Sequence, residues 1–103
     1  MTCSRNDVVL LPIPFTDLAS RKVRPAVVIG SHGSDLFLVP ISSQVANTDF
    51  LLQQWREAGL NVPCGVKAQI ATVEDRLAIK VVGKLGAADR QLLDQRLHGW
   101  LQL

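Results

Sequence analysis

Residues 19–30 read ASRKVRPAVVIG and bring a dense group of cations directly before an apolar run. Arg21, Lys22 and Arg24 precede Pro25, and the four residues that follow the proline are all apolar. Proline has no N–H and a fixed φ, so it suits the start of a strand and restricts the residue before it to extended geometry. We therefore expect a buried strand whose entrance presents Arg24 on a rigid base.

Short apolar segments continue on both sides of this stretch. Besides residues 26–29, the sequence predicts strands over residues 7–13, 36–41, 66–73 and 77–85, with a shorter candidate at 50–52. A polar loop at 14–23 and a glycine-containing turn at 30–35 separate the first three. Short strands at regular spacing, with turn signals between them, predict a small β-barrel or sandwich. The loop at 14–23 is long for a hairpin connection, which favours a functional role for it.

The last part of the chain has a helical period instead. From residue 87 to 101 the apolar residues recur at intervals of three and four, which predicts an amphipathic helix. The predicted apolar face consists of Leu92, Leu93, Leu97, Trp100 and Leu101. Gly86 marks the boundary, and Asp89 lies in the first turn, where the helix dipole favours an acid.

Length and composition predict a single globular domain. Its 103 residues suit a single domain over 1–103, and a 48% hydrophobic content makes disorder unfavourable. No apolar run approaches the roughly 20 residues needed to span a bilayer, so we expect no membrane association. The N-terminal segment is interpreted as a first strand, not a signal peptide. Cys3 and Cys64 match no metal-binding spacing, and two isolated thiols suit a reducing cytoplasm; one disulfide between them is the alternative.

Several common kinds of active site are absent from the sequence. His32 and His98 lie outside any nucleophile-elbow motif, so a Ser-His-Asp hydrolase is not indicated. The chain also lacks a P-loop, a dinucleotide-binding glycine motif and a Cys/His cluster, so no metal site is predicted. The net charge of +2 is lower than that of most proteins that coat duplex DNA. Charge distribution is therefore more informative than the total.

The remaining polar residues of interest lie at predicted strand ends. Arg24 opens one strand and the run Ser42, Ser43 and Gln44 closes another, whereas Lys67 and Gln69 stand two apart and would share one face of a strand. If these ends meet, they form a shallow site of cations, hydroxyls and amides. The plain alternative is a solvated arginine and an ordinary turn.

Such a site suits RNA, because RNA carries its own nucleophile in the 2′-hydroxyl. A protein that aligns this hydroxyl with the adjacent phosphorus, and neutralises charge on the phosphoryl oxygens, can cleave the chain by positioning and electrostatics. Arginine suits the task because its planar fork donates two hydrogen bonds to phosphate and stays charged.

The order of these pieces resembles that in a known family. The motifs R-x-D-V-V-L, K-x-R-P-A-V-V-I, P-I-S-S-Q, G-L-x-x-P, Q-I-A-T-V-E and G-K-L follow one another over residues 5–101. In this order they resemble the MazF/PemK toxins of type II toxin–antitoxin systems. The resemblance implies an SH3-like barrel of five to seven strands with a C-terminal helix, usually a homodimer. It also implies cofactor-independent and metal-independent cleavage of single-stranded RNA, often mRNA, to a 2′,3′-cyclic phosphate and a 5′-hydroxyl, and a cognate antitoxin protein as partner.

Carried over by position, Arg24 matches the family's phosphate-facing catalytic arginine, and Ser42 stands where many members have a threonine. Gln44 matches a glutamine near the same site. Lys67 falls close to a basic position, but Gln69 stands where those members have an aspartate, and residues 14–23 lack the histidine that some members use. Arg24 and Ser42 are therefore the predicted catalytic residues. The residues expected to bind RNA are Arg21, Lys22, Ser43, Gln44, Lys67 and Gln69.

Two other functions are compatible with these residues. The same barrel serves the gyrase-directed CcdB toxins, which bind a protein and cut nothing. A catalytically inactive RNA-binding module is the other, because the aspartate expected at position 69 is missing. The arginine-proline strand and the Ile-Ser-Ser-Gln strand end favour RNA cleavage.

Overall fold

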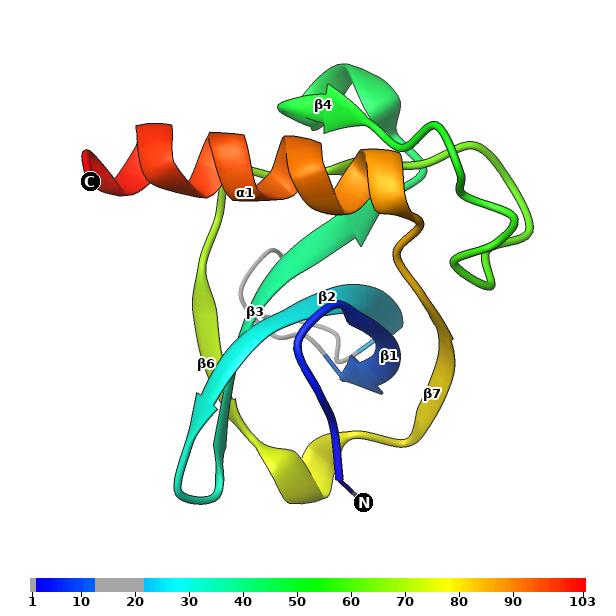
Figure 1. Cartoon of the computed structure of the whole chain (residues 1–103). Helices are drawn as coiled ribbons and strands as arrows, with labels where there is room; N and C mark the ends of the chain where they lie inside the picture. The colour runs from blue at the N-terminus through cyan, green and yellow to red at the C-terminus, as the bar shows by residue number, and fades with distance from the viewer. Residues whose placement is uncertain (1, 13–21) are drawn as a thin grey trace.

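The computed structural model describes residues 2–12 and 22–103, and its strands form one antiparallel sheet (Figure 1). The strands are β1 (Asp7–Pro12), β2 (Val23–His32), β3 (Asp35–Ser42), β4 (Phe50–Leu51), β5 (Gly65–Val66), β6 (Ala71–Glu74) and β7 (Lys80–Lys84). Two 3-10 turns, η1 (Val45–Asn47) and η2 (Asp75–Leu77), lie between them, and α1 (Ala87–Leu101) ends the chain. The sheet order is β4-β5-β3-β2-β1-β7, and β6 pairs with β3.

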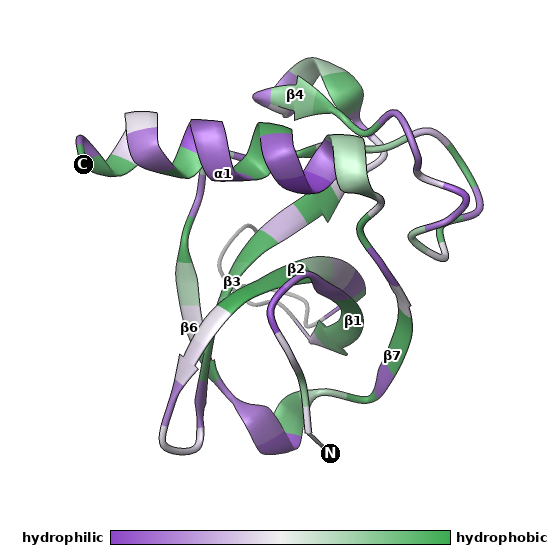
Figure 2. Cartoon of the chain, in the orientation of Figure 1, coloured by the Kyte–Doolittle hydropathy of each residue, from purple (hydrophilic) through white to green (hydrophobic). Residues whose placement is uncertain are grey.

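Both faces of the central strands are buried, which explains why their sequences read as continuous apolar runs. Val8, Val27 and Val39 belong to a cluster that also contains residues of α1, whereas Val9 and Val28 belong to a second cluster. Alternate residues of a strand face opposite sides, so each strand supplies both cores. The hydropathy colouring shows the same apolar strands beneath α1 (Figure 2).

Helix α1 has the predicted bounds and lies across one end of the sheet (Figure 1). Leu93 and Leu97 are buried, and Leu92 and Trp100 pack partly against the same core. Leu101, predicted to lie on the apolar face, is 51% exposed. That prediction is wrong because the core beneath α1 extends only to Trp100, and Leu101 is the last residue of the helix.

Three strand predictions needed correction. The turn predicted at 30–35 is much tighter, because β2 continues to His32, β3 begins at Asp35, and Gly33 adopts a φ of 60°. The strand predicted at 66–73 is divided into two short strands, β5 and β6. Both pair with β3, but β5 pairs with Ile41 and Ser42 near the end of β3, whereas β6 pairs with residues 35–38 near its start. Residues 67–70 cross between these two pairings. The strand predicted at 77–85 is confined to β7, since η2 occupies residue 77.

Candidate functional site

The site is built where β2 begins and β3 ends. These strands are antiparallel, with Ala26 paired to Pro40. Arg24 lies two residues before Ala26 and Ser42 two residues after Pro40, so the two predicted catalytic residues lie on the same side of this pairing. On its other side Arg24 pairs with Leu11 of β1, whose side chain is fully buried. The backbone that carries the guanidinium is therefore held by pairing with β1.

Arg24, Ser42 and Ser43 line one cleft of about 300 Å³. The cleft mixes polar and apolar groups, and the chain segment that precedes β5 supplies part of it. Its described lining consists of Leu10, Val23, Arg24, Pro25, Ile41, Ser42, Ser43, Leu60, Asn61, Val62 and Cys64. The structure thus brings together both residues predicted to be catalytic and one of those predicted to bind RNA.

Ser42 is held in a defined orientation. Its side chain is largely buried, and its Oγ accepts a hydrogen bond from the backbone N–H of Gln44 at 3.0 Å. A hydroxyl that accepts one bond can still donate its own proton to another acceptor. The side chain of Gln44 accepts instead from Asn47 Nδ2 at 3.3 Å, and Gln44 is not among the residues that line the cleft. Gln44 therefore shapes the turn that holds Ser42.

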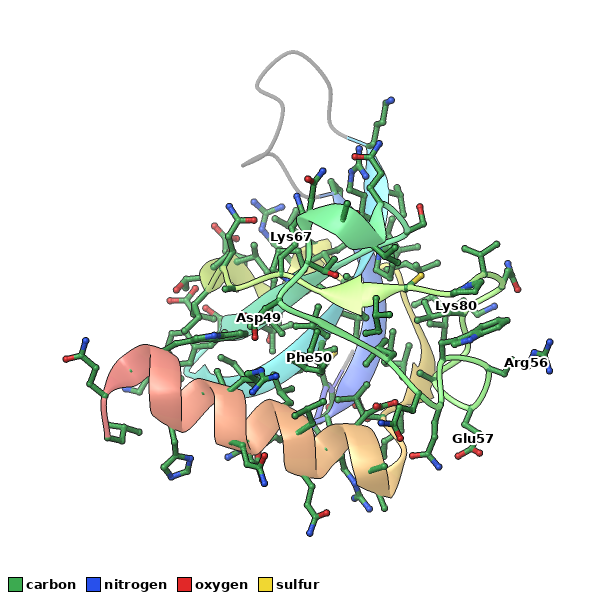
Figure 3. The ribbon with its side chains drawn as sticks, turned by 90° about the horizontal axis from the view of Figure 1, so that it is seen from above. Asp49, Phe50, Arg56, Glu57, Lys67 and Lys80 are labelled. Carbon is green, nitrogen blue, oxygen red and sulfur yellow. The ribbon has the colours of Figure 1, made fainter. Side chains whose placement is uncertain are left out.

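Lys67 and Gln69 do not share a strand face, contrary to the prediction, because both follow the end of β5. The backbone N–H of Lys67, labelled in Figure 3, donates to Pro40 O at 3.0 Å, which places Lys67 beside β3. Lys67 is not among the described residues that line the cleft. Gln69 is exposed. Lys22 is exposed directly before β2, and Arg21 lies outside the described residues.

The described lining of the cleft contains no carboxylate and no imidazole. His32 is exposed at the end of β2, and His98 Nδ1 lies 2.8 Å from Asp94 O on α1. The remaining ionisable group in the lining besides Arg24 is the thiol of Cys64. Burial raises the pKa of the Cys64 thiol, and its Sγ donates to Val62 O at 3.3 Å. A protonated, internally bonded thiol is a poor nucleophile.

This arrangement favours binding and polarising a phosphodiester. The guanidinium can donate to two phosphoryl oxygens, and hydroxyls beside it can donate further hydrogen bonds. Within residues 2–12 and 22–103, no group of three or more His, Cys, Asp or Glu side chains could hold a metal ion. In the same part of the chain, no helix combines the length and apolar character that a bilayer crossing requires.

The sequence predicts that base choice depends on the shape of the loops at 14–23 and 45–62, but it places no individual residue between 60 and 64 in the cleft. Asn61 and Val62 are exposed there, and Val62 is 50% accessible. The motif G-L-x-x-P, which contributes to the family resemblance, covers residues 59–63 and is the sequence signal that could have located this part of the cleft. Its side chains could not be placed because no local pattern shows that residue 60 returns to the entrance of β2.

Comparisons with known proteins bear on the family and the fold of the chain. A family model described as "PemK-like, MazF-like toxin of type II toxin-antitoxin system" matches residues 4–101. Among solved structures, the chain is similar to "Endoribonuclease in complex with its cognate antitoxin from Mycobacterial species", with a TM-score of 0.72 and 15% sequence identity. The match covers 98% of this chain and 94% of that chain, and it confirms the predicted small barrel with a C-terminal helix. A search of curated protein sequences found no match.

Proposed function

The chain belongs to the family of PemK-like and MazF-like toxins of type II toxin–antitoxin systems, and on that premise we propose that it is an endoribonuclease. The substrate is single-stranded RNA, including mRNA, and the RNA supplies the nucleophile. The observation that carries the proposal is that Arg24 and Ser42 line the same cleft.

In the proposed reaction the 2′-oxygen attacks the adjacent phosphorus and the bond from phosphorus to the 5′-oxygen breaks. The 2′-hydroxyl loses its proton and the leaving 5′-oxygen gains one, so the products are a 2′,3′-cyclic phosphate and a 5′-hydroxyl. Arg24 binds the non-bridging oxygens, whose charge grows in the transition state, and the Ser42 hydroxyl orients the phosphate. Donors that are already positioned for that charge are the main source of catalysis in such a site.

Other residues would bind the RNA chain on either side of the scissile phosphate. Ser43 lies in the cleft, and Lys22 is exposed beside the entrance of β2. Both suit contacts to phosphate, which position RNA without reading its bases. Arg21, Gln44, Lys67 and Gln69 complete the proposed binding set, with Gln44 acting through the turn at Ser42.

We further propose two protein partners and a location. One partner is a cognate antitoxin that covers the RNA-binding cleft, as family membership suggests. The other is a second copy of the chain, since the family resemblance implies a homodimer. The protein would act in the cytoplasm, where mRNA and reduced thiols are found.

Incubation of the purified protein with a long single-stranded RNA in the presence of EDTA tests the proposed activity. We expect cleavage that EDTA does not inhibit, and no cleavage by Arg24→Ala. Arg90→Ala is the matched control, because Arg90 is exposed on α1 and is not among the described residues that line the cleft. Intact RNA with the wild-type protein would favour a CcdB-like toxin if RNA also fails to bind, and an RNA-binding module if it does bind.

A further inference from the structure

One wall of the cleft is formed by a loop whose first residues are hydrogen-bonded to α1. We call residues 52–64 the wall loop, because Leu60, Asn61, Val62 and Cys64 line the cleft. Its two ends meet where Leu52 N donates to Cys64 O at 2.9 Å. Figure 1 shows the loop extending beyond the sheet, beside β7 and the first turn of α1. At its outer part Arg56 and Glu57 point away from the body of the molecule (Figure 3).

A buried carboxylate on α1 holds the start of the wall loop. Asp89 has 0% exposure, and its Oδ1 and Oδ2 accept hydrogen bonds from Gln53 N at 2.9 Å and Gln54 N at 2.8 Å. The helix dipole alone does not require this burial, since an exposed acid in the first turn has the same favourable interaction. A buried carboxylate with two backbone donors is a strong and directional anchor.

The wall loop in turn accepts a hydrogen bond from α1. Gln54 Oε1 accepts a hydrogen bond from Ala88 N, in the first turn of α1, at 3.2 Å. The two elements can approach this closely because Gly86 has no side chain: a Cβ there would lie 2.1 Å from Gln54 Oε1. Helix and loop therefore satisfy each other's free backbone donors, which would otherwise need water or another partner.

Backbone hydrogen bonds within the wall loop connect its anchored start to the part that lines the cleft. Ala58 N donates to Gln54 O at 3.2 Å, and Leu60 N donates to Trp55 O at 3.1 Å. Ala58 is fully buried against the sheet, and Leu60 lines the cleft. The series of contacts from Asp89 to the cleft thus runs through Gln54, its neighbour Trp55 and Leu60.

We propose that Asp89 is a positioning residue for the RNA-cleavage reaction, and that by fixing the wall loop it sets which nucleotides the cleft accepts. This inference rests on the proposed function. Asp89 touches neither substrate nor Arg24, and acts through the placement of Asn61 and Val62. Rate and selectivity in such sites depend on small distances, because a displacement of about 1 Å can reduce a rate about a hundredfold.

The test compares Asp89→Asn with the wild-type protein on one long single-stranded RNA. The asparagine has nearly the same shape but lacks the charge and turns one acceptor into a donor. The measured quantity is the ratio of cleavage at the preferred site to cleavage at the next site of the same RNA. That ratio does not depend on how much enzyme is folded, so general destabilisation leaves it unchanged. We expect it to change by about tenfold or more in Asp89→Asn.

Asp94→Asn is the matched control. Asp94 lies on the same helix and pairs with Arg5 at 2.7 Å, but both side chains are about half exposed. We expect this variant to keep the wild-type ratio. If Asp89→Asn also keeps it, the inference is wrong although the proposed function stands; if the wild-type protein cuts no RNA, both fail.

Amide hydrogen exchange tests the anchor without RNA. The N–H groups of Gln53 and Gln54 should exchange at least about tenfold faster in Asp89→Asn, since each loses a charge-assisted bond. Unchanged exchange would overturn the inference. If Asp89→Asn does not fold, Gln54→Leu replaces it, because that change removes the acceptor for Ala88 N. Gln54→Glu keeps an acceptor and should keep the wild-type ratio, whereas equal behaviour of the two Gln54 variants would contradict the proposal.

Discussion

Replacing Gly83 with alanine tests how tightly the wall loop is packed on the sheet. Gly83 lies in β7 and pairs with Val8 of β1. A Cβ at this position would lie 2.4 Å from the carbonyl oxygen of Ala58 and 2.9 Å from the nitrogen of Gly59. These are backbone atoms, so no side-chain rotation relieves the contact. The loop or the strand must move apart by roughly 1 Å to restore an ordinary van der Waals distance.

The expected loss of stability follows from that overlap. Overpacking in a well-packed region costs about 1–3 kcal/mol, and the lower chain entropy of the unfolded alanine variant offsets about 0.4–1 kcal/mol. We therefore expect Gly83→Ala to lower the free energy of unfolding by about 1–2 kcal/mol. For a domain of this size the melting temperature should fall by about 5–15 °C.

Thermal unfolding followed by circular dichroism at one fixed protein concentration measures this change, since association would make the midpoint depend on concentration. Gly99→Ala is the matched control, because a Cβ there has no heavy atom within 4 Å and the residue is in α1. It should stabilise the protein by up to about 1 kcal/mol. If Gly83→Ala melts at or above the wild-type temperature, the wall loop does not pack on β7 as described.

Three further predictions concern the cleft. Arg24→Ala should reduce the rate of RNA cleavage on gels by about 10²–10³-fold, while circular dichroism shows that the variant is still folded. Ser42→Ala should reduce the rate less, because water can partly replace an orienting hydroxyl. A fully active Arg24→Ala would contradict the assignment of the site. Lys22→Ala should weaken binding of an uncleavable 2′-deoxy strand and reduce the slope of log K against log salt by about 0.7 in fluorescence anisotropy, with the cut site unchanged; an unchanged slope would indicate a merely solvated lysine. Because burial raises the pKa of the Cys64 thiol, less thiolate is present at neutral pH, and iodoacetamide should modify it more slowly in the folded protein than in urea; equal rates would contradict its placement.

The strands and the helix could be predicted because their apolar patterns are local. Ala26, Val27 and Val28 after Pro25 are buried as expected, Ile29 is partly buried, and α1 begins directly after Gly86. The break after Val66 could not be predicted, because it depends on β3 exchanging one pairing partner for another. Exposure of Leu101 likewise depends on where the core ends.

Part of the site was also predictable from sequence. A proline after Arg24 and a serine run after Ile41 mark two strand ends, and the antiparallel register joins them. The burial of Asp89 was not predictable, because its partners are the backbone N–H groups of residues that lie more than thirty positions earlier. An acid in a first helical turn has the same local signature whether it faces water or a loop.

Cleavage of an RNA that carries one 2′-deoxynucleotide at the preferred site tests the central claim most directly. The substitution removes the proposed nucleophile and leaves the phosphates that Arg24 and Lys22 would bind. We predict that the wild-type protein binds this RNA, leaves the modified bond intact, and cuts the all-ribose RNA in EDTA to fragments ending in a 2′,3′-cyclic phosphate. Cleavage of the modified bond at a rate near that of the all-ribose RNA would show that the nucleophile comes from elsewhere, and would contradict the account.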